Sequence, residues 1–110
     1  MTALAAPTLS IGLPVYNGER HLADALDSLL AQSFGDFELV IVDNASTDRT
    51  GEIARAYTQR DARVRYHRNP RNIGAAANFN LAVDLTRAPF FKWAAHDDRC
   101  RPGRAGGRCR

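Results

Sequence analysis

Apolar and polar residues alternate in blocks along the chain, and the period within each block predicts its secondary structure. Four short runs, several of them rich in β-branched residues, are predicted as strands at residues 8–13, 37–42, 64–67 and 89–94. The segments between them are predicted as helices over residues 18–32, 48–59 and 74–85. In the first of these helices, apolar residues recur at three- and four-residue spacing and so share one face: Leu22, Ala25, Leu26, Leu29 and Leu30.

Strands that alternate with helices predict parallel βαβ units with right-handed crossovers. The run at 37–42 is almost continuously apolar, which is typical of a strand covered on both faces. Asn17 is expected to cap the first helix. The aromatic residues of the last strand, Phe90, Phe91 and Trp93, are expected in the core. The predicted fold class is therefore α/β with a parallel sheet.

Clusters of polar residues follow all four predicted strands. They lie at residues 16–19, 43–46, 69–72 and 96–98. Ligands of parallel α/β sheets bind at the carboxyl ends of the strands, where these loops converge. The topology therefore predicts a binding site at this edge.

The composition is that of an ordinary soluble domain, since 45% of the 110 residues are hydrophobic and 25% are charged. No apolar run approaches the ~18 residues of a spanning helix, and the first residues do not resemble a secretory signal. We expect a cytoplasmic protein, and attachment to the inner face of a membrane is left open.

The net charge of +3 comes from residues 99–110, which hold five arginines and no acidic residue. We predict two units, a folded domain over 1–98 and a disordered basic tail over 99–110. The tail consists of Arg, Gly, Ala, Pro and Cys, which all have GC-rich codons. We therefore expect that the tail follows a frameshift near Asp98. The alternative is a non-catalytic nucleotide-binding module whose tail contacts RNA or an anionic membrane. The tail lacks aromatic residues for base stacking, so no nucleic-acid partner is expected.

Several common site motifs are absent from the sequence: G-x-G-x-x-G, G-K-[ST] and G-x-S-x-G. What remains is Asp43 after the second strand and the pair Asp97 and Asp98 after the fourth. A carboxylate after the second strand, such as Asp43, can accept hydrogen bonds from a base or a ribose. A carboxylate pair after the fourth strand, such as Asp97 and Asp98, can hold a hard divalent cation against phosphate oxygens. Together they predict a site for a nucleoside diphosphate with Mg²⁺ or Mn²⁺.

Four segments resemble family 2 glycosyltransferases of the GT-A fold. They are residues 10–19 (SIGLPVYNGE), 39–50 (LVIVDNASTDRT), 69–74 (NPRNIG) and 92–98 (KWAAHDD). The resemblance implies the parallel-sheet, nucleotide-binding half of a GT-A (Rossmann-like) fold, incomplete in this chain.

The same resemblance implies which residues meet the donor nucleotide. Pro14, Tyr16 and Asn17 would shape the first loop, and Glu19 would reach toward the base or ribose. Asp43 would hydrogen-bond the base, usually uracil in this family. The other residues implied to shape or border the nucleotide site are Asn44, Ser46, Arg71, Asn72 and Gly74.

His96, Asp97 and Asp98 take the place of the family's D-x-D motif. The resemblance implies that Asp97 contacts the ribose or sugar and that Asp98 binds Mg²⁺ or Mn²⁺. That metal would neutralise the negative charge that develops on the leaving nucleoside diphosphate.

Simpler structural roles stay open for several of these residues. Asp43 and Ser46 would serve equally well as turn and helix caps, and Arg71 as a solvated surface residue. Asp97 and Asp98 repel each other unless a cation or partner is near, although a solvated loop would also tolerate them.

The implied function is inverting, hexosyltransferase-type transfer from a UDP-sugar to a saccharide or lipid-linked acceptor, as in polysaccharide biosynthesis. Family members are longer, and their second half supplies the acceptor site and the general base. No Asp, Glu or His follows Asp98, so this sequence offers no candidate for the base. We therefore expect a truncated N-terminal half that lacks transferase activity by itself.

Overall fold

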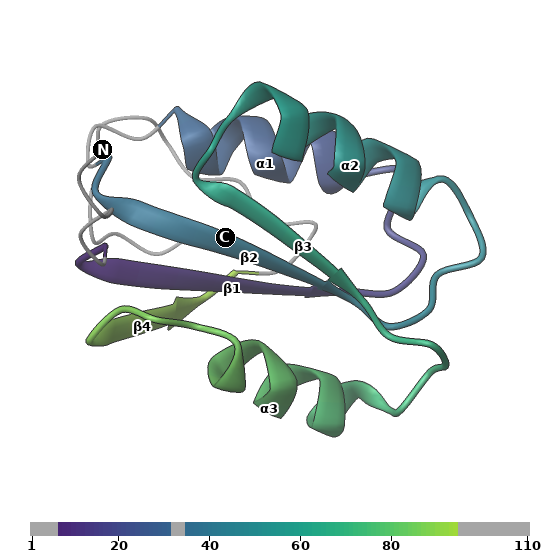
Figure 1. Cartoon of the computed structure of the whole chain (residues 1–110). Helices are drawn as coiled ribbons and strands as arrows, with labels where there is room; N and C mark the ends of the chain where they lie inside the picture. The colour runs from purple at the N-terminus through teal and green to yellow at the C-terminus, as the bar shows by residue number, and fades with distance from the viewer. Residues whose placement is uncertain (1–6, 32–34, 95–110) are drawn as a thin grey trace.

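The computed structural model describes residues 7–31 and 35–94, and every predicted strand and helix is present there (Figure 1). The first strand continues through Pro14 to Val15, and the first helix begins at Leu22 instead of Gly18. In chain order the elements are β1 (Leu9–Val15), α1 (Leu22–Leu30), β2 (Phe37–Asp43), α2 (Thr50–Arg60), β3 (Val64–Arg68), α3 (Ala75–Asp84) and β4 (Phe90–Trp93).

The strands form one parallel sheet in the order β3-β2-β1-β4. Helices α1 and α2 cover one face, and α3 covers the other (Figure 1). This arrangement confirms the predicted α/β fold with parallel βαβ units. The chain adds β2 and β3 on one side of β1 and then places β4 on the other. This reversal leaves a crevice at the carboxyl ends of the strands, where ligands of such sheets bind.

The core consists of two layers, one on each side of the sheet. On one side, apolar residues of β1 and β2 pack against the inner faces of α1 and α2. On the other side, Val40 and Val42 pack against Ala82 of α3 in a thinner layer. All seven residues of β2 are buried, which explains why its sequence is nearly continuously apolar.

Glu38 is the exception in β2, a buried carboxylate near the amino end of the sheet. It accepts hydrogen bonds from Ser10 Oγ at 2.5 Å, from Arg65 Nη1 at 2.9 Å and from the Arg87 backbone N–H at 2.6 Å. Burial by itself would raise the pKa of Glu38, but these hydrogen bonds outweigh it and lower the pKa to about 2. The carboxylate thereby fastens β1, β3 and the segment that leads into β4.

The prediction that the β4 aromatics belong to the core is wrong for two of them. Phe90 is 64% exposed and Trp93 is 41% exposed. Among the described residues, β4 lies at the edge of the sheet and pairs with β1 alone. Trp93 instead packs beside Phe79 and Phe91, with ring centroids 4.8 and 4.6 Å away. The edge position of the strand therefore overrides its apolar composition.

Candidate functional site

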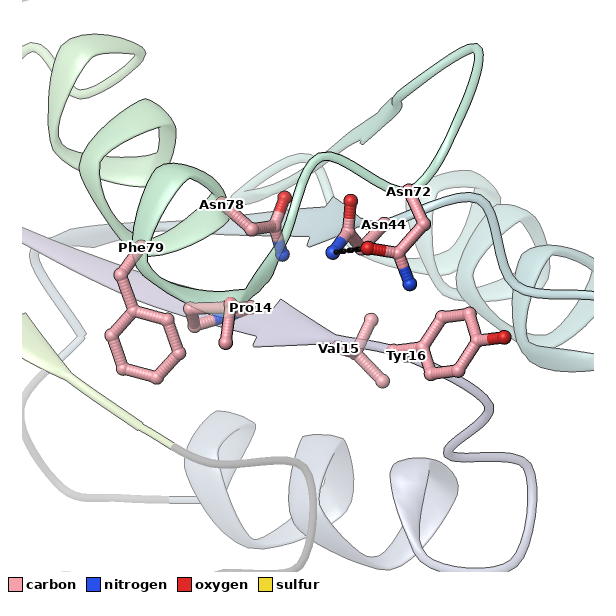
Figure 2. A pocket seen from close by; sticks show the side chains of 8 residues that line it. Pro14, Val15, Tyr16, Asn44, Asn72, Asn78 and Phe79 are labelled. Carbon is pink, nitrogen blue, oxygen red and sulfur yellow. Dashed lines mark hydrogen bonds between the residues drawn. The ribbon is translucent and has the colours of Figure 1, made fainter.

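A pocket of about 330 Å³ opens at the carboxyl ends of β1 and β2, beside the start of α3 (Figure 2). It lies at the edge where the sequence predicted a binding site. The residues that line it come from three segments far apart in the chain: Pro14, Val15, Tyr16, Asn44, Asn72, Ala75, Asn78 and Phe79.

Two aromatic rings give the pocket apolar walls. Tyr16, directly after β1, is 46% exposed, and Phe79 of α3 is 44% exposed. Figure 2 shows the two rings at opposite ends of the pocket, with Pro14 and Val15 between them. Apolar and aromatic walls with a few convergent polar groups are typical of sites for small organic ligands.

The polar groups are side-chain amides that bind one another. Asn44 Oδ1 accepts from Asn69 Nδ2 at 3.0 Å and from the Ile73 backbone N–H at 2.9 Å. Asn44 Nδ2 donates to Asn72 Oδ1 at 2.9 Å, and the Gly74 N–H donates to the same oxygen at 2.8 Å. The loop before α3 is thus fastened to the end of β2 by uncharged groups.

Two further contacts extend this network into α3. Asn69 Nδ2 also donates to Asn78 Oδ1 at 2.8 Å, and Asn78 Nδ2 donates to the Val42 carbonyl oxygen at 3.0 Å. Gly74 precedes the helix with φ of +92°, a conformation that glycine adopts without a Cβ clash. The start of α3 is therefore fixed against the sheet at the pocket.

Asp43 lies beneath the loop that contains Asn44 and does not line the pocket. Its side chain is fully buried. Oδ1 accepts from the Ser46 N–H at 2.9 Å, and Oδ2 accepts from the Tyr66 hydroxyl at 2.6 Å and from Arg68 Nη1 at 3.4 Å. Burial and this bond to Asp43 raise the pKa of Tyr66 to about 12. Both carboxylate oxygens are thus occupied in holding the loop.

Asn17 does not cap the first helix, which corrects the expectation from sequence. Helix α1 begins after His21, and no side chain caps it. Asn17 has φ of +49°, a left-handed conformation that asparagine tolerates. Its N–H donates to Ser46 Oγ at 2.8 Å, and its Oδ1 accepts from the Thr47 N–H at 2.8 Å. Asn17 therefore joins the loop after β1 to the loop after β2.

Glu19 extends this joint between the two loops. Its carboxylate accepts from the Arg49 N–H at 2.9 Å, at the N-terminus of α2. Negative charge is favourable there because helix N-terminal N–H groups lack partners within the helix.

The sequence-predicted residues thus divide into four groups. Those that line the pocket are Pro14, Tyr16, Asn44 and Asn72, and those that brace its loops are Asn17, Glu19, Asp43, Ser46 and Gly74. Arg71 is exposed and is not among the lining residues. Asp97 and Asp98 lie outside the described residues, within which no group of three His, Cys, Asp or Glu side chains could hold a metal ion.

Sequence reasoning missed four lining residues: Val15, Ala75, Asn78 and Phe79. Asn78 carried a usable signal. It lies at three- and four-residue spacing between Ala75 and Ala82, on the helix face that turns toward the sheet. A buried amide on such a face needs partners, and these partners are at the pocket.

The family model "Glycosyl transferase family 2" matches residues 10–106. The chain belongs to this family. It is 36% identical over 92 residues to the uncharacterized glycosyltransferase EpsJ of Bacillus subtilis, covering 84% of this chain and 26% of that protein. It is 32% identical over 99 residues to an uncharacterized glycosyltransferase of Rickettsia typhi, and this match covers 90% of this chain and 30% of that protein. This family 2 chain therefore spans less than a third of the length of either relative.

Solved structures show the same fold. Residues 1–349 of Staphylococcus aureus TarS in complex with UDP match with a TM-score of 0.80 and 28% identity, over 87% of this chain and 29% of that one. The mannosyltransferase PcManGT of Pyrobaculum calidifontis, in complex with GDP-Man and Mn²⁺, matches with a TM-score of 0.78 and 22% identity. This match covers 86% of this chain and 29% of PcManGT. These neighbours support the GT-A assignment of the parallel sheet.

Within residues 7–31 and 35–94, no helix has both the length and the apolar character needed to cross a membrane.

Proposed function

We propose that this chain forms the donor-binding half of an inverting, hexosyltransferase-type glycosyltransferase and that its pocket holds the base of a UDP-sugar. The observation that carries the proposal is the pocket at the carboxyl ends of β1 and β2, where the Tyr16 and Phe79 rings flank the amides of Asn44 and Asn72. TarS, 28 to 29% identical to this chain, has been solved with UDP and with UDP-GlcNAc, which supports the same donor class here.

In this proposal the lining residues contact the base, and the bracing residues hold their loops. Tyr16 and Pro14 provide apolar surface beside the base ring, and Asn44 and Asn72 provide its polar contacts. Asp43 acts through the loop above it, because both of its oxygens already bind protein groups. Arg71, exposed and next to Asn72, is proposed to meet the diphosphate.

The metal site belongs to the proposal as well. Strand β4 runs parallel to β1, so its carboxyl end lies at the same edge of the sheet as the pocket. Asp97 and Asp98 would hold Mg²⁺ or Mn²⁺, for which paired carboxylates are suitable ligands. The bound cation would offset the charge of the leaving nucleoside diphosphate. PcManGT, a neighbour in fold, was solved with Mn²⁺.

The acceptor in the whole protein is proposed to be a saccharide or a lipid-linked saccharide, processed at the cytoplasmic side of the membrane. The general base would come from a part of the protein beyond this chain, since relatives are more than three times as long as the matched region.

Calorimetric titration of the full chain with UDP, with Mn²⁺ present, tests this proposal. We expect saturable binding that weakens about tenfold in Tyr16→Ala, because stacking on one base is worth about 1–3 kcal/mol. Phe90→Ala is the matched control, because Phe90 is more exposed than Tyr16 and lies outside the pocket. Absence of UDP binding, or equal affinity in Tyr16→Ala and the wild type, would overturn the proposal.

A further inference from the structure

We infer that the side of the domain formed by α2 and β3 docks on a membrane surface of anionic lipids, with Arg55 and Arg60 as its main unpaired charges. The inference goes beyond the proposed function and rests on it in one respect only, the lipid-linked acceptor. Its basis is the distribution of charge along the chain and over the fold.

Charged residues are strongly segregated along the chain. Residues 49–71, which contain α2, β3 and the loop after it, hold seven arginines and two acidic residues. Residues 7–48, which precede them, hold one arginine and seven acidic residues. The positive charge of the folded domain is therefore concentrated in the α2–β3 unit.

The fold places this unit along one side of the domain. Among the described residues β3 is an edge strand of the sheet, and α2 packs beside it (Figure 1). The Arg55 guanidinium of α2 lies over the Tyr66 ring of β3, 5.5 Å from its centroid. The Arg60 guanidinium lies over the Tyr57 ring at 4.5 Å. Both arginines are exposed, so each charge is held against the domain and still faces solvent.

Three of the seven arginines have no carboxylate partner within residues 7–31 and 35–94, namely Arg55, Arg60 and Arg71. An aromatic ring attracts a guanidinium without neutralising it, so Arg55 and Arg60 keep their full charge. The ion pairs of the other four are Arg49 with Glu52, Arg63 with Asp61, Arg65 with Glu38 and Arg68 with Asp43.

Protection of the sheet edge explains only part of this charge. Arginines on an edge strand hinder its pairing with another sheet, and Arg65 and Arg68 of β3 are suited to that purpose. Arg55 and Arg60 belong to a helix instead, where the backbone offers no strand edge to protect. A side of one sign attracts a surface of the opposite sign, which gives these two charges a use.

The side chains around these arginines favour a lipid surface over a nucleic acid. Single-stranded nucleic acids bind where exposed aromatic rings accompany the basic residues. The two tyrosines of residues 49–71 are instead turned inward: Tyr57 is buried, and Tyr66 is half-buried. Anionic lipid headgroups need only positive charge close to their surface, and each arginine adds to the attraction.

The α2–β3 side also adjoins the pocket. Strand β3 runs parallel to β2, so it ends at the edge of the sheet that carries the pocket. The loop that follows β3 continues through Arg71 to Asn72, which lines the pocket. A bilayer docked on this side therefore lies next to the donor site, where an acceptor anchored by its lipid can reach the sugar.

Binding of the full chain to lipid vesicles tests the inference. Vesicles of phosphatidylcholine are compared in a sedimentation assay with vesicles of equal parts phosphatidylcholine and phosphatidylglycerol, at low and at high salt. We expect binding to the anionic vesicles alone, and its loss at high salt, because salt screens the attraction. Arg55→Gln combined with Arg60→Gln should weaken this binding about thirtyfold.

Two further double variants separate this surface from other positive charge, including the arginines of residues 99–110. Arg55→Lys with Arg60→Lys keeps the charge and should bind like the wild type. Ala77→Asp with Asn80→Asp removes the same net charge as the glutamine variant, but on α3, at the other face of the sheet (Figure 1). It should bind within about twofold of the wild type. Circular dichroism verifies the fold, which we expect to persist because glutamine and lysine both favour helices.

Equal binding to neutral and anionic vesicles, or equal affinity of the glutamine variant and the α3 variant, would overturn the inference. Tighter binding of single-stranded RNA than of the vesicles, lost in the glutamine variant, would do so as well, because the partner would then be a nucleic acid. UDP affinity should be unchanged in the glutamine variant, since both arginines lie outside the pocket. Binding of anionic vesicles without any binding of UDP would refute the proposed function and support the membrane surface.

Discussion

The Tyr66 hydroxyl donates to Asp43 Oδ2 at 2.6 Å, beneath the loop that forms the pocket and not inside it. Arg68 binds the same oxygen and also donates to the Ser46 carbonyl oxygen at 2.9 Å. The edge strand β3 thereby supports the loop after β2. Asp43 thereby supports its neighbour Asn44, and the contact with the base that the resemblance implied for Asp43 stays a prediction.

Asp43→Asn should disturb this support in a measurable way. The new amide nitrogen would face either the Ser46 N–H or the Tyr66 and Arg68 donors, so we expect a loss of about 1–3 kcal/mol in the free energy of unfolding. The pKa of Tyr66 should fall from about 12, because the negative partner is gone, yet stay above 10 because the ring remains partly buried. NMR titration of the Tyr66 ring carbon would measure this, and an unchanged pKa would refute the pairing.

Glu38 should make the stability of the fold depend on acidic pH. Its pKa is about 2 in the folded chain against an ordinary value of 4.5, so the unfolded chain binds the proton more readily. The stabilisation is therefore complete above about pH 4.5 and is lost as the pH falls toward 2. The shift corresponds to a contribution of about 3 kcal/mol.

Urea denaturation at several pH values tests this expectation. Glu38→Gln should be less stable than the wild type at pH 6 and should lose less stability than the wild type between pH 4.5 and 2. Asp84→Asn, which removes an exposed carboxylate of α3, serves as the matched control. Parallel pH profiles for the wild type and Glu38→Gln would contradict the role of Glu38.

Gly74→Ala should weaken the start of α3 through backbone strain. A Cβ at Gly74 would meet no atom within 4 Å, so crowding is not the cause, but φ is +92°. Residues other than glycine rarely adopt this backbone conformation. We therefore expect a loss of about 1–2 kcal/mol in the free energy of unfolding. Thermal denaturation would measure it. Gly35→Ala is the control, since its Cβ would make only an ordinary contact at 3.7 Å with Arg63; equal effects of the two substitutions would argue against strain.

The order of the elements and the family were both accessible from the sequence. A strand covered on both faces is mostly apolar, as β2 is. A helix that packs against the sheet on one side repeats its apolar residues every three or four positions. The polar loops after the strands then mark one edge, because parallel strands all end there. The prediction of family 2 rested on those same loops and is confirmed.

The direction of each side chain was decided only by the tertiary structure. Asp43 and Asn44 are adjacent, yet one is beneath the loop and the other lines the pocket. Asn17 contacts Ser46 and Thr47 instead of its own helix. Pairing between distant loops determines these directions, and a local pattern does not contain that information. The same holds for Phe90, whose exposure follows from its place at the sheet edge and not from its own hydrophobicity.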